Sequence, residues 1–347
     1  MIKIENHKIG IGHPAFIIAE LSANHCGSLR IAKKTIRSMA ENGANAVKLQ
    51  TFTPDTITID ADTPYFRIKK GPWKGRCLYD VYKEGMTPWE WHKELKEIAE
   101  EEGLIFLASP FDLTAVDFLN SLGVAAFKIA SPEITDIPLI EKCAQTDTPV
   151  IFSSGIATLN DIELAISTCR KNNNDQIALL KCTTAYPTPF EEMNLASLKY
   201  LQDHFRIVTG ISDHSLGSTA AITAVALGAN IIEKHFILSR TLNSVDAIFS
   251  MEPHEFRSMV DDVRNAESAL GNGTYTLTTA MQDKRRFIAR SLFVTKDILT
   301  GGKLTAQNIR SVRPGNGIHP KHLHSILGHH AKHALSKGTP LQWEDIS

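Results

Sequence analysis

The sequence predicts an α/β protein: a closed (β/α)8 or TIM barrel of parallel strands, followed by a small, mostly β domain. Eight short apolar runs recur at spacings of roughly 20–35 residues, which is the spacing of strand–helix units. Helix-like segments lie between most of these runs. Near the C-terminus the pattern changes to short alternating strands with glycine turns, which indicates a second domain.

The eight apolar runs are short and rich in β-branched and aromatic residues. They begin at Phe16, Ala46, Leu104, Ala125, Val150, Ile177, Ile207 and Ile231. Helical periodicity covers residues 29–42, 88–103, 112–122, 158–170 and 254–270. Eight alternating units within the first 270 residues predict a closed barrel. An open doubly wound sheet is disfavoured because no Gly-x-Gly-x-x-Gly follows the first strand.

The expected domains follow from where the alternation stops. Residues 1–270 form the predicted catalytic barrel, residues 271–286 a linker, and residues 287–347 the small domain. An insertion at residues 53–92, between the second and third strands, holds three of the four tryptophans.

Composition limits the partners and the compartment. The formal net charge is −1, so nothing attracts the whole chain to nucleic acid or to an anionic membrane. The N-terminus lacks a basic stretch followed by an apolar one, and no apolar run reaches the roughly 18 residues of a membrane span. The five cysteines are scattered and form no CxxC pair, which favours free thiols in a reducing cytoplasm.

Polar residues follow all eight apolar runs, where a TIM barrel places its active site. One such residue is ordinary at a solvated rim. Eight polar strand ends predict a shared ligand, because converging charges are costly without partners. The candidates are Glu20, Lys48, Gln50, Ser109, Lys128, Ser131, Ser153, Ser154, Thr184, Tyr186, Ser212, His214, Glu233 and His235.

The residue types indicate an anion and a metal ion. Lys48 and Lys128 supply positive charge, and four serines supply short donors near helix starts. These are Ser131, Ser153, Ser154 and Ser212. His214 and His235 end consecutive strands, and two imidazoles with oxygen ligands suit Mn²⁺ or Mg²⁺. No CxxC or HExxH pattern supports a closed zinc site.

The strand-end phrases resemble the N-acetylneuraminate (sialic acid) synthase family along almost the whole chain. The matching phrases are Ile18-AELSANHCGS, Val47-KLQTF, Phe127-KIAS, Ser153-SGIATL, Leu180-KCTTAYPTP, Gly210-ISDHSLG and Ile232-EKHFILSR. The C-terminal phrases Asn308-IRSVRPGNGIHP and Gly338-TPLQWEDI resemble the family's antifreeze-like (SAF) domain. Within the family, the insertion phrase Trp73-KGRCLYDVYKEGMTPWEWH resembles the pseudaminic acid synthase branch, while legionaminic and neuraminic acid synthases share the other phrases.

Two positions depart from the family pattern. Cys26 replaces the second Asn of an Asn-His-Asn-Gly phrase, a change that we expect to touch no substrate. Thr184 stands where the neuraminic branch tends to have Asn, which puts one phosphate contact in doubt.

The resemblance implies an enzyme that condenses phosphoenolpyruvate with an N-acyl amino-sugar aldehyde and releases phosphate. Its strand-end lysines and hydroxyls would hold phosphoenolpyruvate, while Glu20, Glu233 and Asp246 would move protons. A divalent metal on His214 and His235 would polarise the aldehyde. Arg313 matches a family arginine that reaches the sugar bound in a partner's barrel, which implies a domain-swapped homodimer. For the pseudaminic branch the acceptor would be 2,4-diacetamido-2,4,6-trideoxy-altrose, and the aromatic residues of the insertion offer it a wall.

Two other functions are compatible with parts of the sequence. A Schiff-base aldolase would use Lys128 or Lys181, and borohydride trapping with pyruvate would detect it. A non-catalytic sugar-binding or ice-binding protein would need a flat, Thr-rich face, whereas residues 319–333 carry six histidines.

Overall fold

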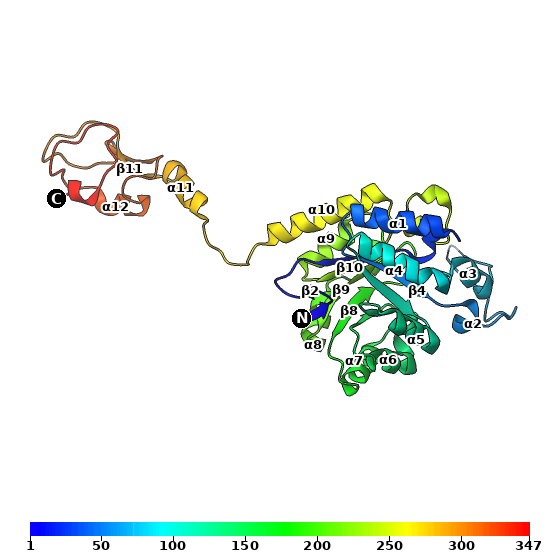
Figure 1. The fold of residues 1–347 in the computed structure, drawn as a ribbon. Coiled ribbons are helices and arrows are strands. Elements are labelled where there is room, and N and C mark those ends of the chain that lie inside the picture. Colours follow the sequence, from blue (N-terminus) through cyan, green and yellow to red (C-terminus); the bar gives the residue numbers. More distant parts are fainter. Residues whose placement is uncertain (72) are drawn as a thin grey trace. The chain divides into compact units, whose positions relative to one another are not determined.

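The computed structural model describes residues 1–71 and 73–347, and these form two compact units (Figure 1). The first unit is Met1–Gly271 and the second is Asn272–Ser347. Each unit is described by itself.

The first unit is the predicted closed barrel of eight parallel strands. The strands follow one another around the barrel in chain order, and β10 closes it by pairing with both β9 and β3. They are β3 (Phe16–Glu20), β4 (Ala46–Thr51), β5 (Ile105–Pro110), β6 (Phe127–Ile129), β7 (Val150–Ser153), β8 (Ile177–Cys182), β9 (Val208–Asp213) and β10 (Ile231–His235). All eight apolar runs are therefore confirmed as strands.

Helices cover the outside of the barrel. They are α1 (Leu29–Glu41), α4 (His92–Glu101), α5 (Leu113–Leu122), α6 (Ile137–Ala144), α7 (Leu159–Lys171), α8 (Ser197–Phe205), α9 (Thr219–Ala226) and α10 (Pro253–Leu270). Of these, α1, α4, α5, α7 and α10 correspond to the predicted segments. Local sequence fixes their ends. Asp112 caps α5 by accepting from the backbone N–H groups of Thr114 and Ala115, and Gly123 ends it with φ 69°.

Side chains alternate along each strand between two separate cores, because successive residues of a strand point to opposite faces. Ile17, Val47 and Phe106 pack outward against the helices. Their neighbours Ile18 and Leu107 fill the barrel interior. Every second residue of each strand therefore faces the barrel interior; these residues are here said to have the inner parity, and their neighbours the outer parity. The alternation continues to the polar residues at the C-terminal ends of the strands, here called the upper end of the barrel.

A short N-terminal hairpin, which the sequence analysis did not predict, closes the lower end of the barrel. Strands β1 (Ile2–Ile4) and β2 (His7–Ile9) pair antiparallel. Ile2, Ile4 and Ile9 are buried in the same cluster as the inner residues of the barrel. The polar candidate residues lie at the opposite end of the barrel, at the C-terminal ends of the parallel strands.

Two long loops frame that upper end. The insertion at residues 53–92 contains α2 (Pro54–Ile57), α3 (Leu78–Gly85) and the 3-10 turn η2 (Trp89–Trp91). The loop after β10 contains two further 3-10 turns, η5 (Arg240–Leu242) and η6 (Ala247–Phe249). Shorter turns follow the other strands: η1 (Ser22–His25), η3 (Pro132–Thr135) and η4 (Phe190–Glu192).

The second unit is built around one antiparallel strand pair. Strands β11 (Ser291–Val294) and β12 (Ile309–Val312) pair, and a small apolar core lies beneath them. Helix α12 (Leu323–Ile326) and the turns η7 (Pro320–His322) and η8 (Trp343–Asp345) complete it. Part of the expected linker is helical, because α11 spans Thr279–Ile288 with Thr278 capping it.

The histidine-rich stretch at residues 319–333 makes ordinary structural contacts. The ring of His322 packs edge-on against Trp343, with 5.0 Å between centroids. His333 Nε2 lies 3.0 Å from Asp345 Oδ1. Over residues 1–71 and 73–347, no three His, Cys, Asp or Glu side chains group in a way that would hold a metal ion.

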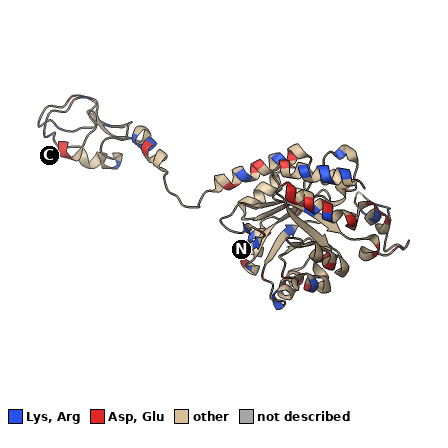
Figure 2. Ribbon diagram, in the orientation of Figure 1, with Lys and Arg blue, Asp and Glu red and all other residues tan. Residues whose placement is uncertain are grey.

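Charged side chains of both signs are interspersed over the outer helices (Figure 2), in keeping with the net charge of −1. In the described part of the chain, no helix is both long and apolar enough to cross a membrane.

Candidate active site

A buried ionic group occupies the upper interior of the barrel. It consists of Glu20, Lys48, Lys128 and Glu233, here called the lysine–glutamate cluster, and every member is at most 4% exposed. Lys48 Nζ lies 2.6 Å from Glu20 Oε2 and 3.2 Å from Glu233 Oε1. Lys128 Nζ lies 3.6 Å from Glu233 Oε1. All four residues have the inner parity of their strands, which is why they converge.

Hydroxyl groups surround this cluster. Lys128 Nζ donates to Ser153 Oγ at 2.5 Å, and Lys48 Nζ donates to Ser109 Oγ at 3.4 Å. Ser212 Oγ donates to Glu233 Oε1 at 2.9 Å. The strand register also sets Gln50 beside Ser109. The hydroxyl groups and the two ammonium groups therefore face the same space, and such a set of hydrogen-bond donors suits an anionic ligand.

Burial and mutual charge shift the pKa values within the cluster. Burial lowers the pKa of Lys48 to about 8, with Glu233 opposing the shift and Lys128 adding to it. For Glu233, burial opposes ionisation, but Lys128 and Lys48 outweigh it and hold its pKa below the usual range. Glu233 is therefore an ionised carboxylate that balances the charge of the two lysines.

His214 and His235 lie side by side above the cluster, with 5.3 Å between ring centroids. Burial lowers the pKa of His214 to about 4, and burial followed by repulsion from His214 lowers the pKa of His235 well below 6.5. Both rings are neutral at pH 7. His214 Nδ1 lies 3.3 Å from the Thr183 carbonyl oxygen, which selects the tautomer with a free Nε2 lone pair.

These two imidazoles fit a divalent metal ion. Buried His235 Nδ1 has no hydrogen-bond partner, and both rings are uncharged, as metal ligation requires. Two protein ligands would leave positions for substrate or water, as in an open, catalytic type of site.

Asp246 adjoins the histidines from the loop after β10. Its Oδ2 lies 3.9 Å from His235 Nδ1 and accepts a 2.5 Å hydrogen bond from Ser22 Oγ. Burial raises the pKa of Asp246, while Ser22 and the backbone of Ala23 oppose the shift. The carboxylate that the family resemblance indicated thus stands beside one of the candidate metal ligands.

The backbone of Gly155 packs closely against the side chains of Ser131 and Thr184. A Cβ atom built on Gly155 would sit 1.9 Å from Ser131 Oγ and 2.7 Å from Thr184 Cγ2, so only glycine fits there. Ser131 Oγ accepts from the Ile156 N–H at 3.0 Å, and Ser154 Oγ accepts from the Cys182 N–H at 3.3 Å. The loop after β7 is thereby held against the ends of β6 and β8.

Several other polar residues at the strand ends point away from the barrel interior and therefore do not reach this site. Lys234 and Asp213 have the outer parity and form a fully buried pair, 2.6 Å between Nζ and Oδ2, that anchors the β9 loop. Lys181 also has the outer parity, and its Nζ donates to the Cys182 carbonyl oxygen. One of the two lysines considered for a Schiff base is therefore turned away. Arg313 belongs to the second unit, where it is exposed.

Two residues of the barrel mouth were missed by the sequence analysis. Glu133 follows Ser131 by two positions, its Oε2 is buried without a partner, and burial raises its pKa to about 7. Its place directly after a strand-end serine was a signal available in the sequence. Phe249 packs against His235, with 4.9 Å between ring centroids, and nothing in the sequence pattern indicated that contact.

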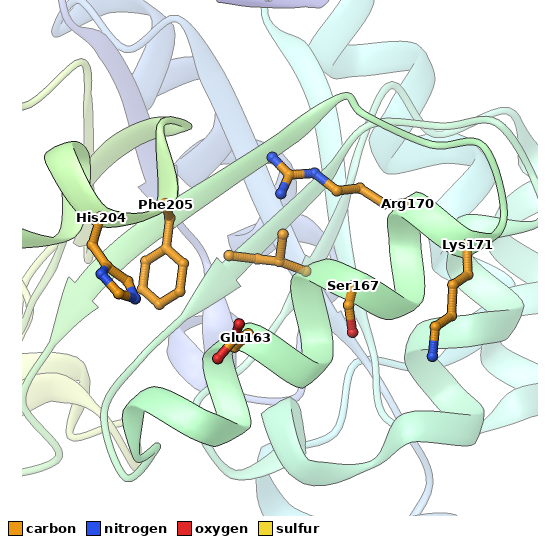
Figure 3. A pocket seen from close by; sticks show the side chains of 7 residues that line it. Glu163, Ser167, Arg170, Lys171, His204 and Phe205 are labelled. Atoms are coloured by element: carbon orange, nitrogen blue, oxygen red, sulfur yellow. The ribbon is translucent and has the colours of Figure 1, made fainter.

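A hollow of about 560 Å³ on the outside of the barrel is unrelated to this chemistry (Figure 3). It lies between α7 and α8, and none of the strand-end residues lines it. Its lining residues are Glu163, Ile166, Ser167, Arg170, Lys171, His204 and Phe205.

The structure is a parallel barrel whose strand ends hold a buried lysine–glutamate cluster next to two neutral imidazoles. Comparison with known proteins gives the family. The chain matches the NeuB family over residues 35–275 and a SAF domain over residues 289–347. It belongs to the NeuB family, and several of its relatives are named pseudaminic acid or N,N'-diacetyllegionaminic acid synthases.

The relatives are similar over nearly full length. A pseudaminic acid synthase of Helicobacter pylori is 46% identical, covering 96% of this chain and 98% of the relative. One from Campylobacter jejuni is 43% identical over 95% and 96%. A solved N-acetylneuraminic acid (sialic acid) synthetase from Leptospira borgpetersenii is 32% identical with a TM-score of 0.74, covering 82% of this chain and 94% of that one.

Proposed function

We propose that this protein is a pseudaminic acid synthase that condenses phosphoenolpyruvate with 2,4-diacetamido-2,4,6-trideoxy-altrose and releases phosphate. The observation that carries the proposal is the buried lysine–glutamate cluster directly beneath two neutral imidazoles. The names of the full-length relatives at 46% and 43% identity support the choice of product.

Phosphoenolpyruvate fits the anion site because it carries a phosphate and a carboxylate. Lys48 and Lys128 would bind these two groups. The hydroxyl groups of Ser153 and Ser212, and the side chains of Ser131 and Thr184, would surround the bound molecule. The two ammonium groups are already held in place by Glu20 and Glu233, so ligand binding orders few new side chains.

The reaction forms one carbon–carbon bond and, at C2 of phosphoenolpyruvate, replaces the carbon–oxygen bond to phosphate with one to an oxygen from water. C3 of phosphoenolpyruvate attacks the sugar aldehyde carbon, water adds to C2, and the bond between C2 and the phosphate oxygen breaks. A divalent metal held by His214 and His235 would act as a Lewis acid and polarise the aldehyde carbonyl.

Protons must reach the aldehyde oxygen and leave the attacking water. Glu20, Glu233 and Asp246 are the carboxylates whose positions next to the lysines or to His235 suit these transfers. Glu133, whose pKa is raised to about 7, holds a further proton near the same mouth.

A second copy of the chain is proposed to cover the mouth. Exposed apolar side chains project from the loops and helix starts that follow the barrel strands. They are Leu113, Ile156, Leu159, Phe190, Leu216 and Ile248. Helix α11 buries none of its residues and exposes Met281, Phe287 and Ile288. A domain-swapped homodimer would bury both surfaces and bring the partner's Arg313 to the sugar.

Phosphate release from phosphoenolpyruvate, measured against a panel of N-acyl sugars, tests the reaction. The 6-deoxy diacetamido altrose should give the highest kcat/KM, with a nine-carbon product confirmed by mass. Preference for N-acetylmannosamine or for the legionaminic precursor would assign the protein to a sister activity. No phosphate release with any sugar would refute a synthase.

Subunit mixing tests the dimer. Arg313→Ala and Glu20→Gln chains should each be inactive, and a mixed dimer should regain part of the activity because it holds one intact site. Two variants that stay inactive after verified subunit exchange would show that each chain builds its site alone.

The five cysteines are all free thiols, and a cytoplasmic location is proposed on that basis.

A further inference from the structure

Trp73 is the one tryptophan of the insertion that contacts residues of the candidate active site. Its indole N–H donates to the Val245 carbonyl oxygen at 3.2 Å, next to Asp246. Its ring centroid lies 6.1 Å from that of Tyr186. Tyr186 in turn lies 4.4 Å from His214 and 5.1 Å from Phe249. Trp73, Tyr186 and Phe249 thus form an aromatic wall beside the two histidines.

The other tryptophans of the insertion have structural partners. Trp89 stacks on Phe118, with 4.9 Å between centroids, and its indole N–H donates to the Phe52 carbonyl oxygen. Trp91 packs edge-on against His25. These two hold the insertion to the barrel, and Trp73 extends from it over the mouth.

The chemistry of the wall selects its ligand. The Tyr186 ring contacts both Trp73 and His214. A sugar whose aldehyde lay at the histidines and whose carbon chain ran along Tyr186 would therefore bring its far end to the indole. Trp73 is only partly buried, so it retains some accessible surface. An apolar ring face attracts a methyl group and offers a hydroxyl no hydrogen-bond partner.

We propose that Trp73 is a specificity-determining residue that contacts the C6 methyl group of the acceptor sugar. It would favour 6-deoxy sugars over their 6-hydroxy counterparts. The inference rests on the proposed function, because it presumes a sugar acceptor whose aldehyde lies at His214 and His235.

The experiment compares 2,4-diacetamido-2,4,6-trideoxy-altrose with the same sugar bearing a 6-hydroxyl. The wild type should prefer the 6-deoxy sugar by roughly 10–100-fold in kcat/KM. Trp73→Ala should reduce that ratio at least about tenfold while the KM for phosphoenolpyruvate changes little. Trp73→Phe keeps a ring face and loses the N–H bond to Val245, so it should keep most of the preference.

Trp89→Phe is the matched control, because that residue stacks on Phe118 away from the mouth, and it should leave the ratio unchanged. A wild type without preference would overturn the proposal. So would a Trp73→Ala variant that loses both sugars in parallel, or a Trp73→Phe variant that behaves like Trp73→Ala, since either result marks a structural tie. Absence of phosphate release with both sugars would instead refute the synthase function itself.

Discussion

Replacing Glu133 with Gln should stabilise the barrel in a pH-dependent way. Glu133 lies on η3, directly after β6, and its Oε2 is buried without a hydrogen-bond partner. Burial raises its pKa from 4.5 to about 7, against an opposing contribution from Lys128. Because the folded pKa exceeds the unfolded one, the native state binds this proton more tightly than the unfolded chain does.

The sign of the effect follows from that difference. Below pH 4.5 Glu133 is protonated in both states and carries no ionisation penalty. As the pH rises through 4.5 to about 7 the unfolded chain gains stability by ionising, and the penalty is complete above about 7. A shift of about 2.5 units corresponds to at most about 3 kcal/mol, and water at the mouth reduces it. Glutamine keeps the shape and does not titrate.

Denaturant unfolding of the wild type and Glu133→Gln at pH 5 and pH 8.5 measures this. The stability of the variant relative to the wild type should increase between the two pH values by up to about 2.5 kcal/mol, because part of the penalty is already present at pH 5. Glu141→Gln, at an exposed position on α6, is the control and should show no such increase. A difference for Glu133→Gln that stays constant across pH would refute the reasoning, because it would mean that the carboxyl titrates alike in both states.

Three further results are expected. Chelation should abolish product formation and Mn²⁺ or Mg²⁺ should restore it, whereas a His214→Ala/His235→Ala variant with full activity would exclude a two-histidine metal site. Lys48→Met should weaken phosphoenolpyruvate binding at least about tenfold, by loss of a charge-assisted contact of roughly 1.5–3 kcal/mol. Lys181→Met, on the outer parity, should leave that affinity unchanged, and equal losses in both variants would contradict the assignment. Gly155→Ala should displace Ser131 and raise the KM for phosphoenolpyruvate. An unchanged KM would show that Ser131 and Thr184 do not contact phosphoenolpyruvate.

The barrel was predictable because its signal is local and repeated. Each strand is an apolar run, and caps such as Asp112 and Gly123 mark the helix ends. The N-terminal hairpin was not predicted because its strands are three residues long and are stabilised by burial under the barrel. Helix α11 was missed because residues 271–286 break the strand–helix alternation and look like a linker, and none of the α11 side chains is buried.

The sequence by itself determined which residues end the strands, and the motif order that indicated the NeuB family is a property of the chain alone. Only the tertiary structure decided which of those residues meet. Lys48 and Lys128 converge on Glu233, whereas Lys181 and Lys234 are turned away, because closing the barrel fixes which strand parity faces inward. Likewise Trp73, and neither Trp89 nor Trp91, reaches Tyr186, because that contact joins residues more than 100 positions apart and depends on how the insertion packs over the barrel mouth.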